Sequence, residues 1–241
     1  MINIQDLGWP KNTRILVILA HPDDPEFFLG GTIAMWTHAG YQVDYGLLTD
    51  GELGLSEAFP DPQELAKVRR VEQQAASDAL GVSSITWFGY PDGFLVPDLD
   101  KRKVIARFIR QMKPDVVVSS DPTSYYLGEN YLNHPDHRAA GQIVAEGLFP
   151  AAGNRGFFPE IQEEGFLPHQ VSELWMSLPA NKNLDIDVTD YWDFRVKALL
   201  NHHSQVGTPD VFMQRMLDRR NQSAEGPDCY IESFRRIVFR K

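Results

Sequence analysis

The chain alternates between short apolar runs and longer segments in which apolar residues recur every three or four positions. Residues 15–19 form an unbroken apolar run, which is typical of a parallel strand buried on both faces. Further strands are predicted at 41–49, 84–88, 115–119, 171–177 and 184–188, and helices at 30–39, 64–80, 99–112, 135–148 and 191–201. This alternation predicts an α/β fold, a single Rossmann-like domain with a mostly parallel sheet flanked by helices.

We expect a core of about residues 1–148 and a C-terminal α/β extension of about 149–241. An irregular connection rich in Gly, Pro and Phe is predicted for 149–168, and helices are predicted after residue 210. His202 and His203 lie in this extension, far along the chain from the other polar motifs. We interpret them as structural or interface residues.

A polar cluster directly follows the first strand. It reads His21, Pro22, Asp23, Asp24, Pro25, Glu26. In an open α/β sheet, ligands bind at the carboxyl ends of the strands, where the strand order reverses. A histidine beside two carboxylates, stiffened by prolines, is well suited to hold a cation, so a metal site is the first hypothesis.

A second cluster contains Asn133, His134, Pro135, Asp136 and His137. Proline suits the first position of a helix, so the two histidines, three residues apart, can lean toward one side of a helix start. Together with His21 and Asp24, His137 would complete the three protein ligands of an open catalytic zinc site.

The sequence resembles the LmbE/PIG-L family of zinc-dependent sugar N-deacetylases. The resemblance rests on His21–Glu26 followed by Gly30 and Gly31, on Thr49, Asp50, Gly51 and Glu52, and on His134–His137, in this order along most of the chain. It implies a hydrolase that removes an acetyl group from the 2-amino position of a glucosamine-containing sugar or glycoconjugate. It also implies a bound zinc ion, which another divalent metal such as iron could replace in cells.

Two residues are candidates for the chemistry. Asp23 is adjacent to the predicted ligand Asp24 but free to face a water molecule, so it is the candidate general base, as the resemblance also implies. His134 is placed to donate a hydrogen bond to the oxyanion that develops on the acetyl carbonyl.

The resemblance also implies two substrate-binding residues. Arg69 matches an arginine that grips the sugar, and Asp92 matches a carboxylate that accepts hydrogen bonds from sugar hydroxyls. The residues alone permit simpler interpretations, a solvated helix face for Arg69 and a Pro-Asp-Gly turn for Asp92.

Two further carboxylates are expected to support the site. Asp136 either orients a histidine ring or caps the helix that follows, and the residues alone leave both possibilities open. Glu26, with Arg138, is expected to hold the two polar loops together.

Composition restricts the partners. The formal net charge of −10 disfavours a protein that binds nucleic acid or anionic membranes.

Cys229 is the only cysteine, so no intramolecular disulfide can form, and we expect a cytoplasmic protein without a membrane span. The apolar, aromatic segment 147–158 has no predicted element to bury it, and with the resemblance it suggests a homo-oligomer, a trimer or hexamer.

Two other functions remain as alternatives. One is a sugar-binding or regulatory protein that keeps the site without turnover, which the presence of Asp23 and His134 disfavours. The other is a dinucleotide-binding oxidoreductase. That function would need Gly-x-Gly-x-x-Gly after the first strand, and this spacing is absent.

Overall fold

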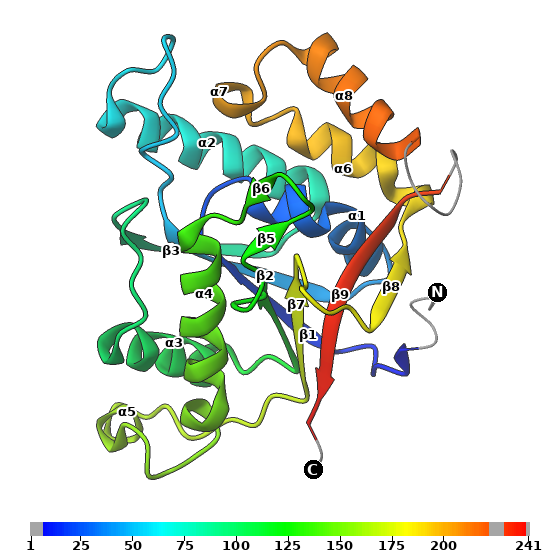
Figure 1. The fold of residues 1–241 in the computed structure, drawn as a ribbon. Helices are drawn as coiled ribbons and strands as arrows, with labels where there is room; N and C mark the ends of the chain where they lie inside the picture. Colours follow the sequence, from blue (N-terminus) through cyan, green and yellow to red (C-terminus); the bar gives the residue numbers. More distant parts are fainter. Residues whose placement is uncertain (1–6, 222–228, 240–241) are drawn as a thin grey trace.

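The computed structural model describes residues 7–221 and 229–239 (Figure 1). The strands are β1 (Arg14–Leu19), β2 (Gln42–Thr49), β3 (Ser84–Tyr90), β4 (Val116–Ser120), β5 (Tyr126–Leu127), β6 (Tyr131–Leu132), β7 (Glu173–Ser177), β8 (Leu184–Asp187) and β9 (Ile231–Val238). The helices are α1 (Asp24–His38), α2 (Pro62–Leu80), α3 (Leu99–Met112), α4 (Pro135–Glu146), η2 (Gly147–Ala152), α5 (Pro159–Glu163), η3 (Thr189–Tyr191), α6 (Trp192–Leu199), α7 (His203–Val206) and α8 (Pro209–Asn221).

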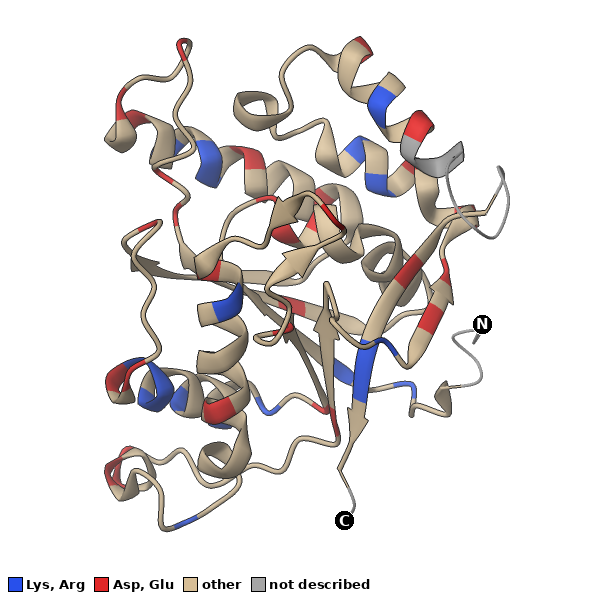
Figure 2. Ribbon diagram, viewed as in Figure 1, with Lys and Arg blue, Asp and Glu red and all other residues tan. Residues whose placement is uncertain are grey.

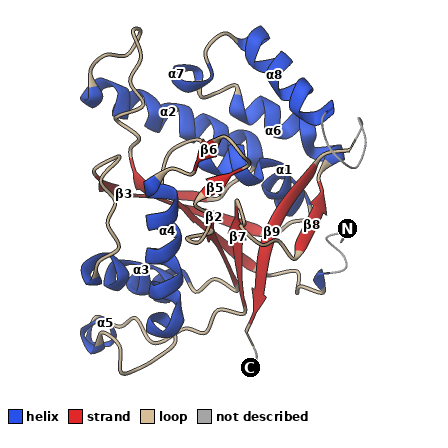
Figure 3. Ribbon diagram, viewed as in Figure 1, coloured by secondary structure: helices blue, strands red, loops and turns tan. Residues whose placement is uncertain are grey.

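The main sheet has seven strands in the order β3-β2-β1-β4-β7-β9-β8 (Figure 3). The five strands from β3 to β7 are parallel, and β9 runs antiparallel to both β7 and β8. The strand order reverses at β1, because β2 lies on one side of it and β4 on the other. The predicted α/β fold with a mostly parallel sheet is confirmed, and the first polar cluster follows the strand at the reversal point.

The side chains of β1 explain why the sheet carries helices on both faces. Ile15, Val17 and Leu19 are buried in one hydrophobic cluster with residues of α1, α2 and α6. Leu16 and Ile18 are buried in a second cluster with residues of α3 and α4. Alternate residues of a strand point to opposite faces, so a fully apolar strand needs two helical layers, which Figure 1 shows on either side of the sheet.

Helix α1 begins at Asp24, earlier than the predicted start at residue 30, and non-helical backbone at Leu29 (φ −151°, ψ 25°) divides it. Pro25 suits a helix start because its fixed φ is already helical, which explains the early beginning. Gly30 and Gly31 do not line the site. A Cβ on Gly31 would stand 2.7 Å from the Val188 side chain, so this glycine lets the C-terminal part pack against α1.

The C-terminal part differs most from the sequence analysis. Residues 231–238 form β9, a strand that inserts between β7 and β8, whereas only helices were predicted after residue 210. Helix α8 does form there. The connection 149–168 was predicted to be irregular, but its first residues belong to the short helix η2 (Gly147–Ala152) directly after α4, and α5 (Pro159–Glu163) follows. Leu148, Ala151 and Ala152 of η2 are buried.

Basic residues lie along α3, and acidic residues lie on α4 and in and just after α5 (Figure 2). Arg102 pairs with Glu146, Lys103 with Glu160 and Arg107 with Glu164. These residues of α3 therefore form a partly exposed outer surface whose charges are paired within the chain. Within residues 7–221 and 229–239, no helix is long and apolar enough to cross a membrane.

Candidate active site

Two polar segments meet at the carboxyl end of the sheet. One follows β1 and carries His21, and the other leads into α4 and carries His134 and His137. The ring centroid of His21 lies 4.8 Å from that of His134 and 5.1 Å from that of His137. Helix α4 reaches this point because residue 141 is glycine: a Cβ there would stand 2.2 Å from the carbonyl oxygen of Ser120, the last residue of β4.

Asp24 lies between two of these imidazoles. Its Oδ1 is 3.1 Å from Nε2 of His137, and its Oδ2 is 3.4 Å from Nδ1 of His21. Oδ2 also accepts a hydrogen bond of 2.8 Å from the backbone N–H of His21. Burial would raise the pKa of this carboxyl, but His137 and His21 outweigh burial and lower the pKa below its ordinary range. The carboxylate is ionised and could bind a cation.

The tautomer of His137 follows from its neighbours. Nδ2 of Asn133 donates a hydrogen bond of 2.8 Å to the carbonyl oxygen of Ser124, which leaves Oδ1 of Asn133 facing Nδ1 of His137 at 2.9 Å. An amide oxygen only accepts, so Nδ1 of His137 carries the proton and donates. In the neutral ring, Nε2 then keeps its lone pair on the side that faces Asp24, and this is the form that a metal-ligating histidine needs.

The second ring nitrogen of His21 faces two carboxylates. Nε2 lies 3.0 Å from Oδ1 of Asp92 and 3.4 Å from Oδ2 of Asp136. Asp136 is fully buried and also accepts hydrogen bonds of 2.7 and 3.2 Å from two backbone N–H groups of the loop after β3. Burial lowers the pKa of His21, but Asp24 and these two carboxylates outweigh burial and raise the pKa well above its ordinary value.

Among the described residues, two groups of three side chains each place one potential ligand atom within 4.8 Å of the others. These groups are His21, His134 and His137, and His21, Asp92 and Asp136. The predicted set of His21, Asp24 and His137 is a third arrangement, with the separations given above. The hydrogen bonds around each nitrogen decide which arrangement suits a metal ion best.

His134 occupies the position just before α4. Its Nδ1 accepts a hydrogen bond of 3.2 Å from the backbone N–H of Asp136. In the neutral ring the proton must then lie on Nε2, which is free to donate. Burial lowers the pKa of His134, and the neighbouring His21 and His137 lower it further, so the neutral ring is favoured.

Asp23 is held by Arg69. Nη2 of Arg69 lies 3.0 Å from Oδ2 of Asp23 and also donates to the carbonyl oxygen of Pro22 at 2.5 Å. Nη1 of the same arginine donates to the carbonyl oxygen of Gly51 at 2.8 Å. Burial raises the pKa of Asp23 above its ordinary value even though Arg69 opposes the shift. Asp23 thus combines a fixed position with the raised proton affinity that suits a base.

Known proteins share these segments. The sequence profile of the GlcNAc-PI de-N-acetylase family, PIG-L, matches residues 16–148, which include both polar segments. A diacetylchitobiose deacetylase of Thermococcus kodakarensis is 33% identical over 192 residues, which cover 80% of this chain and 70% of that protein. The chain belongs to the PIG-L family.

Two further proteins extend the comparison beyond the PIG-L profile. A probable N-acetyl-alpha-D-glucosaminyl L-malate deacetylase of Bacillus anthracis is 30% identical over 211 residues, which cover 85% of this chain and 87% of that protein. The solved structure of the N,N'-diacetylchitobiose deacetylase from Pyrococcus horikoshii superimposes with a TM-score of 0.84 at 28% identity, covering 94% of this chain and 84% of that one. The likeness therefore includes the C-terminal part.

Glu26 does not join the two polar segments of this PIG-L chain in the way we expected. It is fully buried, and it accepts hydrogen bonds from Tyr45 in β2 and Gln73 in α2. Nε2 of His202 lies 3.2 Å from its Oε2. The contacts of Glu26 thus connect α1 to the sheet, to α2 and to the C-terminal part. Arg138 instead stacks on the ring of Tyr125, with its guanidinium carbon 3.8 Å from the ring centroid.

A cavity of about 460 Å³ opens over these groups. It is lined by His21, Asp23, Asp24, Phe27, Phe28, Leu53, Gly54, Arg69, Asp92, Gly93, Tyr131, His134, His137 and Gln205. All predicted catalytic, metal and substrate residues line it, while Glu26 and Asp136 lie behind it.

Sequence reasoning gave no role to Asn133 or to Phe27 and Phe28. The position of Asn133 directly before His134 was the available signal for the former.

Proposed function

We propose that this chain is a metal-dependent hydrolase that removes the N-acetyl group from the 2-amino position of a glucosamine-containing sugar or glycoconjugate. The observation that carries the proposal is the pair of adjacent carboxylates in one cavity: Asp24 lies between two imidazoles, and Asp23 lies beside Arg69 with a raised pKa. The PIG-L profile, which matches both segments, and the deacetylase relatives support the reaction type.

We assign the metal to His21, Asp24 and His137. Tetrahedral ligand atoms at about 2.0 to 2.1 Å from a zinc ion lie about 3.3 Å apart, close to the 3.4 and 3.1 Å separations that join Asp24 to the two histidines. Nδ1 of His134 is already used by a backbone N–H, which makes His134 a weaker third ligand. The donor set suits Zn²⁺, and Fe²⁺ is the main alternative because nitrogen and oxygen ligands select weakly.

We assign Asp92 and Asp136 to the outer side of His21. Metal-ligating histidines commonly donate their second N–H to a carboxylate, which fixes the ring and its tautomer. Nε2 of His21 lies 3.0 Å from Asp92 and 3.4 Å from Asp136, which fits this role better than a second metal site. A sugar hydroxyl could still reach Asp92, because this residue also lines the cavity.

The proposed chemistry divides the work between two residues. A bound divalent ion would polarise the acetyl carbonyl and lower the pKa of a water molecule to about 7. Asp23 accepts the proton of the attacking water and then passes it to the departing amine. Because Arg69 engages Oδ2, we assign this proton to Oδ1. Nε2–H of His134 donates to the carbonyl oxygen as negative charge develops there.

Arg69 remains a proposed substrate residue whose main contacts lie within the protein. Its guanidinium already binds Asp23 and the carbonyl oxygens of Pro22 and Gly51. These contacts indicate that Arg69 affects the sugar indirectly, by fixing the position of Asp23. Tyr131, Phe27 and Phe28 line the same cavity and offer aromatic surface to a sugar ring.

One experiment separates this proposal from the alternatives. Metal analysis is combined with amine release from a panel of N-acetylated sugars that includes N-acetylglucosamine and N,N'-diacetylchitobiose. We expect about one divalent ion per chain and release of acetate. A metal without turnover on any substrate would favour a non-catalytic sugar-binding protein, and the absence of both metal and turnover would refute the proposal.

We further propose that the chain forms a homo-oligomer, a trimer or hexamer. In segment 147–158, Leu148, Ala151 and Ala152 are buried, but Phe149 is 67% exposed. The ring of Phe149 stacks on that of Phe239 with the centroids 6.3 Å apart, and Val238 beside Phe239 is also exposed. A contiguous exposed apolar surface is typical of an interface. Light scattering that returned a monomer at all concentrations would refute this.

A further inference from the structure

Asp23 has a backbone conformation that few residues adopt without support. Its φ of 82° and ψ of −28° lie in the left-handed region, where a Cβ crowds the following carbonyl oxygen. Such a conformation persists only when surrounding groups fix it. Arg69 holds the side chain of Asp23, but it does not touch the backbone N–H.

Gln73 of α2 supplies that backbone contact. Its side chain is fully buried, and its Oε1 accepts a hydrogen bond of 2.7 Å from the N–H of Asp23. Its Nε2 donates to Oε1 and Oε2 of Glu26 at 3.0 and 3.1 Å. A carboxylate only accepts, so Glu26 fixes the orientation of the Gln73 amide and turns the amide oxygen toward Asp23.

Glu26 is itself held from the C-terminal part of the chain. Nε2–H of His202, which is fully buried, donates to Oε2 of Glu26 across 3.2 Å. A buried carboxylate needs such partners, because an unpaired charge in the interior is strongly unfavourable. His202 lies outside the residues matched by the family profile, yet it ends a continuous series of contacts that begins at Asp23.

We propose that Gln73 is a positioning residue for Asp23, and that His202 acts on it through Glu26. The series of contacts from His202 through Glu26 to Gln73 fixes the left-handed backbone of Asp23, and with it the direction of the carboxylate in the cavity. The inference rests on the proposed role of Asp23 as the base. It gives the C-terminal part a role in the reaction, since His202 from that part holds Glu26, the partner of Gln73.

The first test replaces Gln73 by methionine, which has a similar length but no acceptor oxygen. We expect kcat to fall about 10- to 100-fold, because a displacement of about 1 Å can cost that much, while KM and bound metal stay at wild-type values. Gln74→Met is the matched control, since Gln74 is the next residue of α2 and its exposed side chain donates a hydrogen bond to Asp78. Equal kcat in Gln73→Met and wild type would overturn the proposal.

A double-mutant cycle distinguishes positioning from a general loss of structure. If Gln73 acts through Asp23, Gln73→Met should lower kcat little or not at all in an Asp23→Asn background. The same fold-loss in both backgrounds would overturn the proposal.

His202→Leu should reproduce the kcat loss of Gln73→Met, and His202→Gln, which keeps a donor, should restore part of it. His203→Leu, at the exposed neighbouring position, serves as the control.

A measurement independent of activity completes the test. Hydrogen exchange of the Asp23 amide, followed by NMR, should accelerate about tenfold or more in Gln73→Met and stay unchanged in Gln74→Met. Gln73→Asn, whose amide is too short to reach Asp23, should act in the same direction if Gln73→Met does not fold. Unchanged exchange in the folded variant refutes the positioning role. A wild-type protein without deacetylase activity would refute the proposed function instead, so the two failures can be told apart.

Discussion

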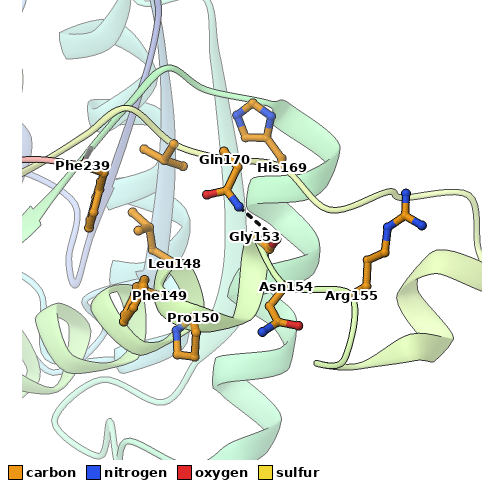
Figure 4. Close-up of a pocket in the computed structure, with 10 residues that line it drawn as sticks. Leu148, Phe149, Pro150, Gly153, Asn154, Arg155, His169, Gln170 and Phe239 are labelled. Atoms are coloured by element: carbon orange, nitrogen blue, oxygen red, sulfur yellow. Dashed lines mark hydrogen bonds between the residues drawn. The ribbon is translucent and has the colours of Figure 1, made fainter. Parts of the chain in front are cut away.

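Two cavities of nearly equal size lie at opposite ends of the parallel strands. The candidate active site, of about 460 Å³, lies beyond the carboxyl ends of β1 and β4. The second cavity, of about 470 Å³, is lined partly by His169, Gln170 and Val171, which precede β7, and by Phe149 and Phe239 (Figure 4). Size alone therefore does not distinguish the candidate active site from the other cavity.

The difference lies in what the backbone presents at each end. Helices α1 and α4 begin at the candidate active site, where their N-terminal turns favour anionic groups such as Asp24 and Asp136. At the second cavity, His169 contacts the carbonyl oxygen of Pro114 at 2.6 Å. Nearby, Arg110 donates to the carbonyl oxygens of residues 151, 152, 154 and 157. The polar groups of that end are used to satisfy the backbone, so they serve stability.

The largest expected effect is at His137. His137→Ala should lose the bound metal and bring turnover down to the assay background, because it removes one of three proposed ligands. His169→Ala, in the wall of the second cavity, should keep both. Metal analysis of the purified variants checks the difference. Full metal occupancy in His137→Ala would show that the ligand set is wrong.

The next effect is at Asp23. Asp23→Asn nearly preserves the shape of the side chain but removes the proton acceptor, so turnover should fall by about 10² to 10⁴ while metal stays bound. Steady-state kinetics with parallel metal analysis measures both. Wild-type turnover at full metal occupancy would transfer the role of base to another carboxylate, with Asp136 the first to examine.

His134→Ala should have a slightly smaller effect. Removal of one oxyanion donor costs about 2.7 to 4 kcal/mol in other hydrolases, equivalent to about 10² to 10³ in kcat. The loss should fall on kcat with little change in KM, since the hydrogen bond strengthens as charge develops. A variant that lost substrate affinity and kept kcat would contradict the assignment.

A substitution of Glu173, the first residue of β7, tests whether the amino end of the sheet contributes to stability alone. Burial would raise its pKa, but Arg236 and two tryptophan N–H donors lower the pKa below its ordinary value of 4.5. Its contribution to stability is then fully present above pH of about 4.5 and is lost as pH falls through the lower folded-state pKa. Glu173→Gln should lower the free energy of unfolding, measured with urea at pH 7, by about 2 kcal/mol. It should also weaken the dependence of that free energy on pH in the acid range and leave turnover unchanged. A kcat loss would mean that this end contributes to the reaction.

Phe149 is expected to affect the association state and not turnover. Phe149→Ser should leave kcat near the wild-type value and lower the association state in light scattering, if this exposed residue lies in an interface. A loss of activity that appears together with the lower association state would instead indicate that the assembled form completes the active site.

The sequence by itself determined which polar residues meet in the candidate active site and at which edge of the sheet they lie. An apolar run followed by His21, Asp23 and Asp24 predicts a polar group at the end of a buried strand, because local pattern and backbone restriction are enough to place it. The second histidine pair could be assigned to the same end for the same reason. These signals are local, so a single sequence contains them.

Only the tertiary structure decided how the groups are oriented. The pairing of His21 with Asp92, of Glu26 with His202, and of Gln73 with the backbone of Asp23 joins elements far apart in the sequence. The insertion of β9 between β7 and β8 likewise depends on neighbouring strands. Propensity does not encode such contacts, because they exist only once burial makes each buried polar group find a partner.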